Sequence, residues 1–409
     1  MEINKIITEA EEVLKERFKK IEDVSLKNQA KVLNAFRKNK IALRHFNGTT
    51  GYGYGDEGRD TLNKLYADVF GCDDAIVSET LITCGSHSIK TALYGLLRPN
   101  DIMLSISGKP YDTMDETIFG VEGKDNGSLK DFGVKYEQID LIDDNCFDFK
   151  AIEEKLSQIS PKIIYIQRSR GYSLRNGISI KKIEEVCSFI RKFNQTTKIV
   201  VDNCYCEFVE EKEPTEVGAN VAIGSLIKNP GAGLVSCGGY IAGDSDSIDS
   251  ISAMLTSSSL KREVGCNEKG YRLLYQGLFM APHTVSQALK GSYLFSYAME
   301  KKGYKVLPDH TTDISDIVRT IFFEDKQDLI DLCAVVQHFS PVDSYVTPEP
   351  YEMAGYESEV IMSAGCFVEG SSIELSCDSP LVKPYVLYIQ GGLTYEHVKL
   401  VVNEFLNKK

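Results

Sequence analysis

The sequence predicts an α/β protein, with a large domain built on a mostly parallel sheet and a smaller α+β domain at the C-terminus. Two near-continuous apolar runs, at residues 163–166 and 199–201, are typical of strands buried on both faces, as in a parallel sheet covered by helices. Helical patterns alternate with such runs along the middle of the chain. The length of 409 residues exceeds one small core and fits a large domain plus a smaller one.

The N-terminal region is predicted to form amphipathic helix. From residue 2 to about 40, apolar side chains recur at helical spacing among lysines and glutamates: Ile6, Ile7, Val13, Leu14, Phe18 and Ile21. The pattern breaks at HFNGTTGYGYGDEG. We therefore assign residues 1–50 to an N-terminal helical segment.

The large domain is predicted over residues 51–265. TLNKLYADVFG is typical of a helix that stops at Gly71, and a short strand follows at residues 75–78, then strand-like ETLIT. Beyond it, strands (DIMLSIS, KIIYIQ, KIVVDN) alternate with helices (AIEEKLSQI, SIKKIEEVCSFIRKF). Residues 266–409 are predicted to hold a linking helix and the small domain, which ends in the helix YEHVKLVVNEFL.

Composition limits the classes of partner. The chain has 59 acidic and 46 basic residues, a formal charge of −13 that opposes binding to nucleic acid or anionic lipid. Its 11 cysteines are scattered and odd in number, which indicates reduced thiols. The N-terminus lacks a signal-peptide pattern and no window approaches 18 apolar residues, so we expect a cytoplasmic protein with no membrane partner. The histidine and cysteine spacings do not match a metal site.

One glycine-rich motif points to a different cofactor. Gly53, Gly55 and Gly58 match the G-x-G-x-x-G pattern of dinucleotide sites. The segment before them is charged and turn-rich, so the required strand is weak. Asp56 and Glu57 would also aim carboxylates at a pyrophosphate. We therefore favour another purpose for this loop.

Lys228 is the leading candidate for chemistry. It follows an apolar, strand-like segment in AIGSLIKNPGAG and precedes a Pro-Gly turn. The carboxyl ends of strands in an α/β sheet form the ligand crevice, so a lysine there can reach a bound carbonyl compound. An isolated lysine is ordinarily a solvated surface residue, but here the flanking Ile227 and glycine-rich turn favour the crevice.

Asp202 ends the strand KIVVD, where burial of an unpaired carboxylate would be costly. A protonated pyridine nitrogen would provide the cation that it needs. The alternative is an aspartate that caps the next turn. Ser225, three residues before Lys228, could meet a phosphate of the same cofactor.

Two further features lie nearer the N-terminus. Gly85, Ser86 and His87 begin the helix HSIKTALYGLL, and a helix N-terminus offers free N–H groups to an anion. Such a Gly-Ser pair is more often only a helix cap. Tyr111 in SGKPYDTMDE could stack on a pyridine face, although most tyrosines pack in the core.

The order of these features resembles the methionine gamma-lyase-like group, also known as aluminium-resistance proteins, within the fold-type-I pyridoxal 5'-phosphate (PLP) enzymes related to cystathionine lyases. The resemblance covers nearly the whole chain. It rests on GYGYGDEGRDTL, the Gly85-Ser86-His87 helix start, SGKPYDT, YIQRSRGYSLR, VVDNCYCEF, GSLIKNPGAG, GSSIELSCDSP and YVLYIQGGLTYEH. By this resemblance Lys228 would carry PLP as a Schiff base, Asp202 would pair with the pyridinium, and Tyr111 would stack on the ring. Gly85, Ser86, His87 and Ser225 would lie at the phosphate.

The resemblance also implies a shared active site. In related lyases a tyrosine and an arginine of the neighbouring subunit complete the phosphate site, and Tyr54 and Arg59 are similar to that pair. A homodimer or homotetramer is therefore expected. Where the family has an arginine after GSSIELS, this chain has Val382 and Lys383, so the substrate carboxylate would fall to Arg170, Arg175 or Lys383.

The leading functional hypothesis is carbon–sulfur bond cleavage in a sulfur amino acid. Lys228 would act as the general base, and Tyr54 or Tyr111 would assist proton transfer to the leaving sulfur. The alternatives are another PLP reaction, such as an aminotransferase or aldolase step, a PLP-binding protein without turnover, and a dinucleotide oxidoreductase.

Overall fold

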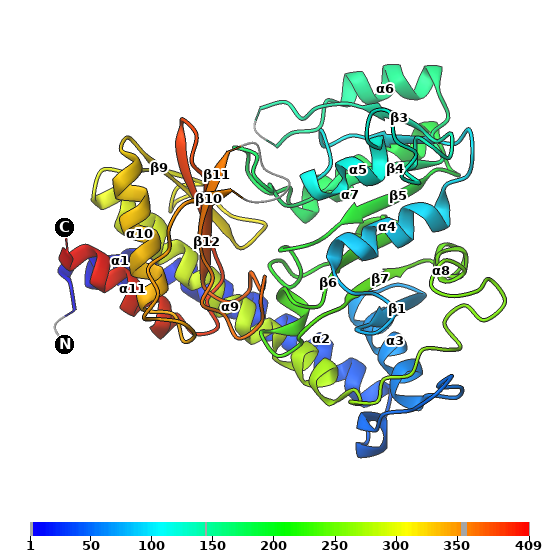
Figure 1. The fold of residues 1–409 in the computed structure, drawn as a ribbon, viewed down its shortest axis with the longest axis horizontal. Helices are drawn as coiled ribbons and strands as arrows, with labels where there is room; N and C mark the ends of the chain where they lie inside the picture. Colours follow the sequence, from blue (N-terminus) through cyan, green and yellow to red (C-terminus); the bar gives the residue numbers. More distant parts are fainter. Residues whose placement is uncertain (1–2, 144, 353–357, 409) are drawn as a thin grey trace.

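The computed structural model describes residues 3–143, 145–352 and 358–408. These residues form two domains, each built on its own sheet (Figure 1). The predicted fold class is confirmed, because the first sheet is mostly parallel and the second is antiparallel. No helix in the described ranges is long and apolar enough to cross a membrane.

The large domain contains a seven-stranded sheet in the order β1-β7-β6-β5-β4-β2-β3. β7 runs antiparallel to both of its neighbours, β1 and β6, and the pairs among β6, β5, β4, β2 and β3 are parallel. The strands are β1 (Asp74–Ser78), β2 (Ile102–Ser105), β3 (Lys135–Gln138), β4 (Ile163–Gln167), β5 (Lys198–Asp202), β6 (Val221–Ser225) and β7 (Gly239–Gly243).

Helices cover both faces of this sheet. Apolar residues of α4 and α8 share one buried cluster with residues such as Tyr165 and Val200, whereas α6 and α7 pack on the opposite face against residues such as Ile164 and Val201. The central strands are therefore buried on both sides, as their apolar runs predict. The helices are α3 (Glu57–Phe70), α4 (Gly85–Leu96), α5 (Asp115–Phe119), α6 (Phe149–Gln158), α7 (Ile180–Phe193) and α8 (Ser245–Ser252).

The small domain contains a six-stranded sheet in the order β10-β11-β12-β13-β9-β8. Its strands are β8 (Lys305–Leu307), β9 (Val318–Phe323), β10 (Tyr351–Glu352), β11 (Glu359–Ser363), β12 (Ser376–Pro380) and β13 (Tyr385–Gln390). Its helices are α10 (Lys326–His338) and α11 (Tyr395–Lys408).

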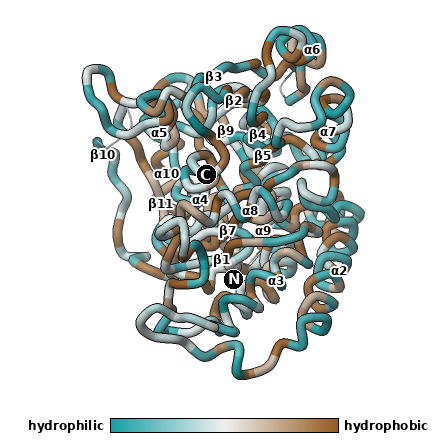
Figure 2. The backbone as a smooth tube through the Cα atoms, turned by 90° about the vertical axis from the view of Figure 1, so that its right-hand side faces the viewer, coloured by the Kyte–Doolittle hydropathy of each residue, from teal (hydrophilic) through white to brown (hydrophobic). Residues whose placement is uncertain are grey.

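Helical segments join the two domains. The N-terminal helices are α1 (Lys5–Val13) and α2 (Lys15–Lys38), and the 30-residue α9 (Arg272–Lys301) precedes the small domain. Figure 1 shows α2 and α9 running side by side beneath both domains. Hydrophilic and hydrophobic residues alternate along α2, as expected for an amphipathic helix (Figure 2).

One predicted strand is wrong. The run ETLIT (residues 79–83) is a loop, because β1 ends at Ser78. The Ser78 hydroxyl accepts hydrogen bonds from the backbone N–H groups of Thr80 (3.2 Å) and Leu81 (2.9 Å), which turns the chain out of the sheet. This turn carries the chain directly to the start of α4.

Candidate functional site

A cavity of about 230 Å³ lies between the large sheet and the small domain. Three successive parallel strands, β4, β5 and β6, each end in a residue that lines it: Gln167, Asp202 and Ser225. This is the crevice position expected for ligands of open α/β sheets. The sequence-predicted residues that line the cavity are Gly85, Ser86, Tyr111, Asp202, Ser225 and Lys228.

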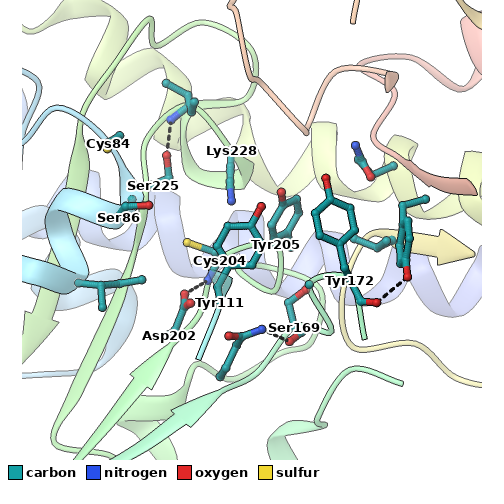
Figure 3. Close-up of a pocket in the computed structure, with 18 of the residues that line it drawn as sticks. Cys84, Ser86, Tyr111, Ser169, Tyr172, Asp202, Cys204, Tyr205, Ser225 and Lys228 are labelled. Carbon is teal, nitrogen blue, oxygen red and sulfur yellow. Dashed lines mark hydrogen bonds between the residues drawn. The ribbon is translucent and has the colours of Figure 1, made fainter. Parts of the chain in front are cut away.

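Lys228 lies just beyond β6, at the start of the short 3-10 helix Asn229–Gly231. Figure 3 shows its side chain reaching into the cavity with the amine beside Tyr205, and the amine nitrogen lies 3.7 Å from the Tyr205 ring centroid. Burial lowers the pKa of Lys228, but Tyr205, Cys204, Tyr111 and Asp202, in decreasing order of effect, together raise that pKa above its ordinary value.

Asp202 is a buried carboxylate with a cavity-facing position. It is 6% exposed, accepts a hydrogen bond from the Cys204 N–H (3.1 Å) and lies 3.5 Å from the Tyr165 hydroxyl. Burial raises the pKa of Asp202, while the Cys204 N–H and the charge of Lys228 oppose that rise. A ring nitrogen that carries a proton would supply the cationic partner that such a carboxylate needs.

The N-terminus of α4 forms the next wall of the cavity. The first turn of a helix leaves backbone N–H groups without intrahelical partners, and the side chain of the preceding Cys84 does not cap them. Gly85 fits closely here, since a Cβ at this position would lie 3.1 Å from the Ser225 Cβ. The Ser86 hydroxyl lies 2.9 Å from that of Thr113. These groups together could hold a phosphate.

His87 does not line the cavity, although it lies in the same helical turn. Its ring turns back toward the preceding loop, where Nδ1 accepts a hydrogen bond from the Thr83 N–H (3.2 Å). The side chain therefore stabilises the entry into α4.

Tyr54 and Arg59 lie outside the cavity of their own chain. Tyr54 is 60% exposed and stacks on Tyr52 with a centroid distance of 5.4 Å. Arg59 is buried and donates to the Gly53 carbonyl (3.0 Å) and to Asp60 (3.0 Å). Their role at a neighbouring subunit's site stays a prediction. The glycine-rich loop before α3 follows a 3-10 turn at Leu43–Phe46, so the strand required by a dinucleotide motif is not there.

The three side chains predicted for the substrate carboxylate are not brought to the cavity. Arg170 is fully buried in an ion pair with Asp316, with Nη2 to Oδ1 at 3.4 Å. The Arg175 guanidinium donates to backbone carbonyls, including that of Gln167 (2.9 Å). Lys383 is exposed in the turn between β12 and β13. Arg170 and Arg175 already have partners within the protein, and Lys383 lies on the surface. None of the three lines the cavity.

Several cavity-lining residues were not predicted from the sequence. Gln167, Ser169, Gly171 and Tyr172 come from the run YIQRSRGYSLR, in which only Arg170 and Arg175 are predicted site residues. The other unpredicted residues are Cys84, Ile89, Cys204, Tyr205, Ile227, Val318, Asp378, Tyr388 and Gln390. The extended backbone after β4 directs alternate side chains in opposite directions, which was an available signal.

Tyr205 also carries unusual backbone geometry. Its φ of +71° lies in the left-handed region, which is uncommon for a residue with a side chain. Its hydroxyl oxygen lies 3.1 Å from that of Ser372, in the run GSSIELS. This contact holds the ring against Lys228 and links the two domains.

A second buried carboxyl, Glu207, lies behind the loop that carries Lys228. Its Oε1 accepts a hydrogen bond from the Tyr240 hydroxyl (2.9 Å), and a Cβ on Gly224 of β6 would lie 2.3 Å from the same oxygen. Burial, with the charge of Glu213 as a lesser cause, raises the pKa of Glu207 to about 8. Glu207 does not line the cavity.

Comparison with known proteins assigns the chain to a family. The family model for methionine gamma-lyase matches residues 3–409. The chain belongs to the methionine gamma-lyase family. Protein YnbB of Bacillus subtilis (strain 168), whose function is uncharacterised, is 46% identical over 382 residues, which are 93% of this chain and 90% of YnbB.

Solved structures agree with this membership. A carbon–sulfur lyase involved in aluminium resistance from Clostridium novyi NT is 42% identical, with a TM-score of 0.95 over 99% of this chain and 96% of the other. The PLP-dependent protein YhfS from Escherichia coli is 17% identical, with a TM-score of 0.64 over 95% and 97% of the two chains, which shows a shared fold alone. The predicted family, the fold-type-I class and an enzyme of the PLP-dependent carbon–sulfur lyase class are confirmed.

Proposed function

We propose that the protein releases a thiol, a 2-oxo acid and ammonia from a sulfur amino acid, in a reaction of the methionine gamma-lyase or cystathionine lyase type. One observation carries this proposal: a lysine amine, a buried carboxylate and a helix N-terminus face one cavity at the ends of parallel strands. The family membership and the Clostridium novyi relative support carbon–sulfur cleavage as the reaction class.

The cavity residues fit PLP. Lys228 would hold the aldehyde carbon, Asp202 the protonated ring nitrogen, and Tyr111 the ring face. The phosphate would lie at the start of α4, with Gly85, Ser86 and Ser225. When bound, PLP supplies an electron sink for the negative charge that forms at the substrate α carbon.

The protein's side chains would move the protons. The Lys228 amine would take the α proton from the substrate as general base, and the Asp202 carboxylate would keep the ring nitrogen protonated. The hydroxyl of Tyr111, with Tyr54 of a second subunit as the alternative, would donate a proton to the leaving sulfur. One water is consumed for each thiol, 2-oxo acid and ammonium ion formed.

The test is an absorption spectrum of the purified protein and of Lys228→Ala, before and after methionine, cystathionine or cysteine is added, with thiol release measured in parallel. We expect a visible band in the wild type, lost or shifted in the variant, and thiol release only by the wild type. The control is Lys212→Ala, because Lys212 is exposed and does not line the cavity.

Two results would overturn parts of this proposal. A protein that cannot be reconstituted with PLP would refute the cofactor assignment. A coloured protein that releases no thiol would refute the lyase reaction and favour an aminotransferase or aldolase step, tested with glutamate plus 2-oxo acids, or a PLP-binding role without turnover.

We further propose that the active unit is a homodimer or homotetramer with shared sites. The support is that Tyr54, on a loop with two exposed stacked tyrosines, and Arg59, in the first turn of α3 that follows, both lie outside their own cavity. Mixing inactive Lys228→Ala with inactive Arg59→Ala subunits should restore about a quarter of the wild-type activity, because half of randomly paired dimers would contain one intact site. Absence of any recovery, with mixed dimers isolated, would contradict shared sites.

We also propose a cytoplasmic location. All 11 cysteines are unpaired thiols, which is the state expected in a reducing compartment.

A further inference from the structure

The cavity has a second end, formed by the small domain. Asp378, Tyr388 and Gln390 come from the paired strands β12 and β13, and Tyr172 faces them from the large domain. Asp378 accepts hydrogen bonds from the Tyr172 hydroxyl and from the Gln390 amide, the latter at 3.3 Å. We name these four residues the small-domain end of the cavity.

The charge at this end is unbalanced. Of the described residues that line the cavity, only Asp202, Lys228 and Asp378 are charged, and the first two lie together at the other end. Throughout the described ranges, no lysine, arginine or histidine forms an ion pair with Asp378. The neighbouring Arg170 is already paired with Asp316. Asp378 therefore presents a carboxylate whose polar contacts are neutral donors.

A purely structural role does not explain a carboxylate here. An asparagine could accept the same hydrogen bond from Tyr172 without the cost of removing a charge from water. Burial in fact raises the pKa of Asp378, and the bonds from Tyr172 and Gln390 only oppose that rise. A cationic group of a ligand would offset this cost and stabilise the charged form.

Aromatic rings connect the two ends. The ring centroids of Tyr111 and Tyr172 are 6.3 Å apart, and those of Tyr172 and Tyr388 are 4.9 Å apart. Their faces and edges offer an apolar path from the site of chemistry to Asp378. Such a path suits the carbon chain of a thioether, and aromatic rings also attract a cation at the end of that chain.

We propose that the preferred substrate is a thioether amino acid whose sulfur substituent ends in an ammonium group, and that Asp378 binds this ammonium. The inference rests on the proposed lyase function and defines its substrate class. In the reaction, the bond between sulfur and the amino-acid carbon breaks, the sulfur gains a proton, and an aminothiol leaves. Water then converts the remaining fragment to a 2-oxo acid and ammonium.

The first test compares two substrates of equal length, S-(2-aminoethyl)cysteine and S-propylcysteine, which differ only in a terminal ammonium or methyl. We expect kcat/KM to favour the aminoethyl compound by about tenfold or more, and Asp378→Asn to reduce this ratio to within about twofold. Asp23→Asn, on the exposed surface of α2, is the matched control and should keep the full ratio. An equal kcat/KM for both compounds in the wild type would overturn the proposal.

A binding measurement separates this proposal from the lyase reaction. Lysine and 2-aminoheptanoate differ in the same way but contain no sulfur, so neither can be cleaved. Calorimetric titration of the PLP-loaded protein should show tighter binding of lysine, and Asp378→Asn should remove the difference. If that preference is present while no thiol is released from any thioether, the substrate recognition stands and the lyase reaction fails. If thiol is released but neither pair is discriminated, the lyase reaction stands and the role of Asp378 fails.

Discussion

The two ends of the central cavity are built from different kinds of structure. The cofactor end takes its residues from the carboxyl ends of parallel strands and from a helix start, as with Asp202, Ser225 and Gly85. The small-domain end takes Asp378 and Tyr388 from directly paired positions inside antiparallel strands. The first arrangement places catalytic groups on short connections with defined geometry. The second presents a sheet face whose side chains can change with little effect on the backbone, which suits substrate selection.

The largest effect that would test this comparison is expected at Asp202. Asp202→Asn replaces the carboxylate with a neutral amide of similar shape, so the ring nitrogen of PLP would lose the group that keeps it protonated. We expect kcat to fall by about 10³-fold, because the charge stabilisation is lost where negative charge develops. The measurement is single-turnover thiol release with saturating PLP.

The same variant also tests whether Asp202 affects the choice of substrate. Asp202→Asn should lower the rates with aminoethyl and propyl thioethers alike, since Asp202 lies at the end of the cavity where both substrates react. A variant with near-normal kcat and tightly bound PLP would contradict the assignment. A variant that changed only the preference between the two substrates would show that the two ends do not divide chemistry from selection.

The same division explains which parts of the site could be predicted from the sequence. Lys228, Ser225 and Asp202 lie next to turns at strand ends, so apolar runs followed by glycine, proline or polar residues locate them. Asp378 is different, because its position depends on which strands pair and on which face points inward. The pairing and the facing of Asp378 follow from the register of β12 with β13, and the sequence of either strand alone does not reveal this register.

The arginines of YIQRSRGYSLR show a second limit. The charge of Arg170 and Arg175 predicts a contact with the substrate carboxylate, but in the structure both bind internal groups, Asp316 and backbone carbonyls. Sequence composition does not reveal whether a cation already has an internal partner. The neutral neighbours Gln167 and Ser169 line the cavity instead. The prediction of a strand at ETLIT is wrong for a similar reason. Its composition is typical of a strand, but hydrogen bonds to the Ser78 hydroxyl turn the backbone out of the sheet.

Two carboxyl groups can be compared directly, because each accepts a hydrogen bond from a tyrosine but only one of them lines the cavity. Asp378 is bound by Tyr172 and faces the cavity, whereas Glu207 is bound by Tyr240 and lies behind the Lys228 loop. Only Asp378 can meet a ligand. Glu207 should therefore affect the stability of the cofactor end, and not the choice of substrate.

The final prediction follows from the pKa of about 8 for Glu207 in the folded protein, which lies above the ordinary value of 4.5. Between these two pH values the unfolded chain has released the proton and the folded chain retains it. The free energy of unfolding must therefore fall as pH rises through this window. Glu207→Gln cannot titrate, so its stability relative to the wild type should increase between pH 5 and pH 8 by on the order of 3 kcal/mol.

Urea denaturation of both proteins at pH 5, 6.5 and 8, each with bound PLP, would measure this difference. The amide of the variant also differs in shape from the carboxyl group. Any loss of stability from this difference is the same at every pH, so the change in relative stability with pH remains. The ratio of kcat/KM for the aminoethyl and propyl substrates should stay at the wild-type value, because Glu207 does not line the cavity. Parallel stability curves across the pH range would show that Glu207 ionises normally within the fold. A changed substrate ratio would show instead that the support behind Lys228 reaches the small-domain end, and the division between the two ends would fail.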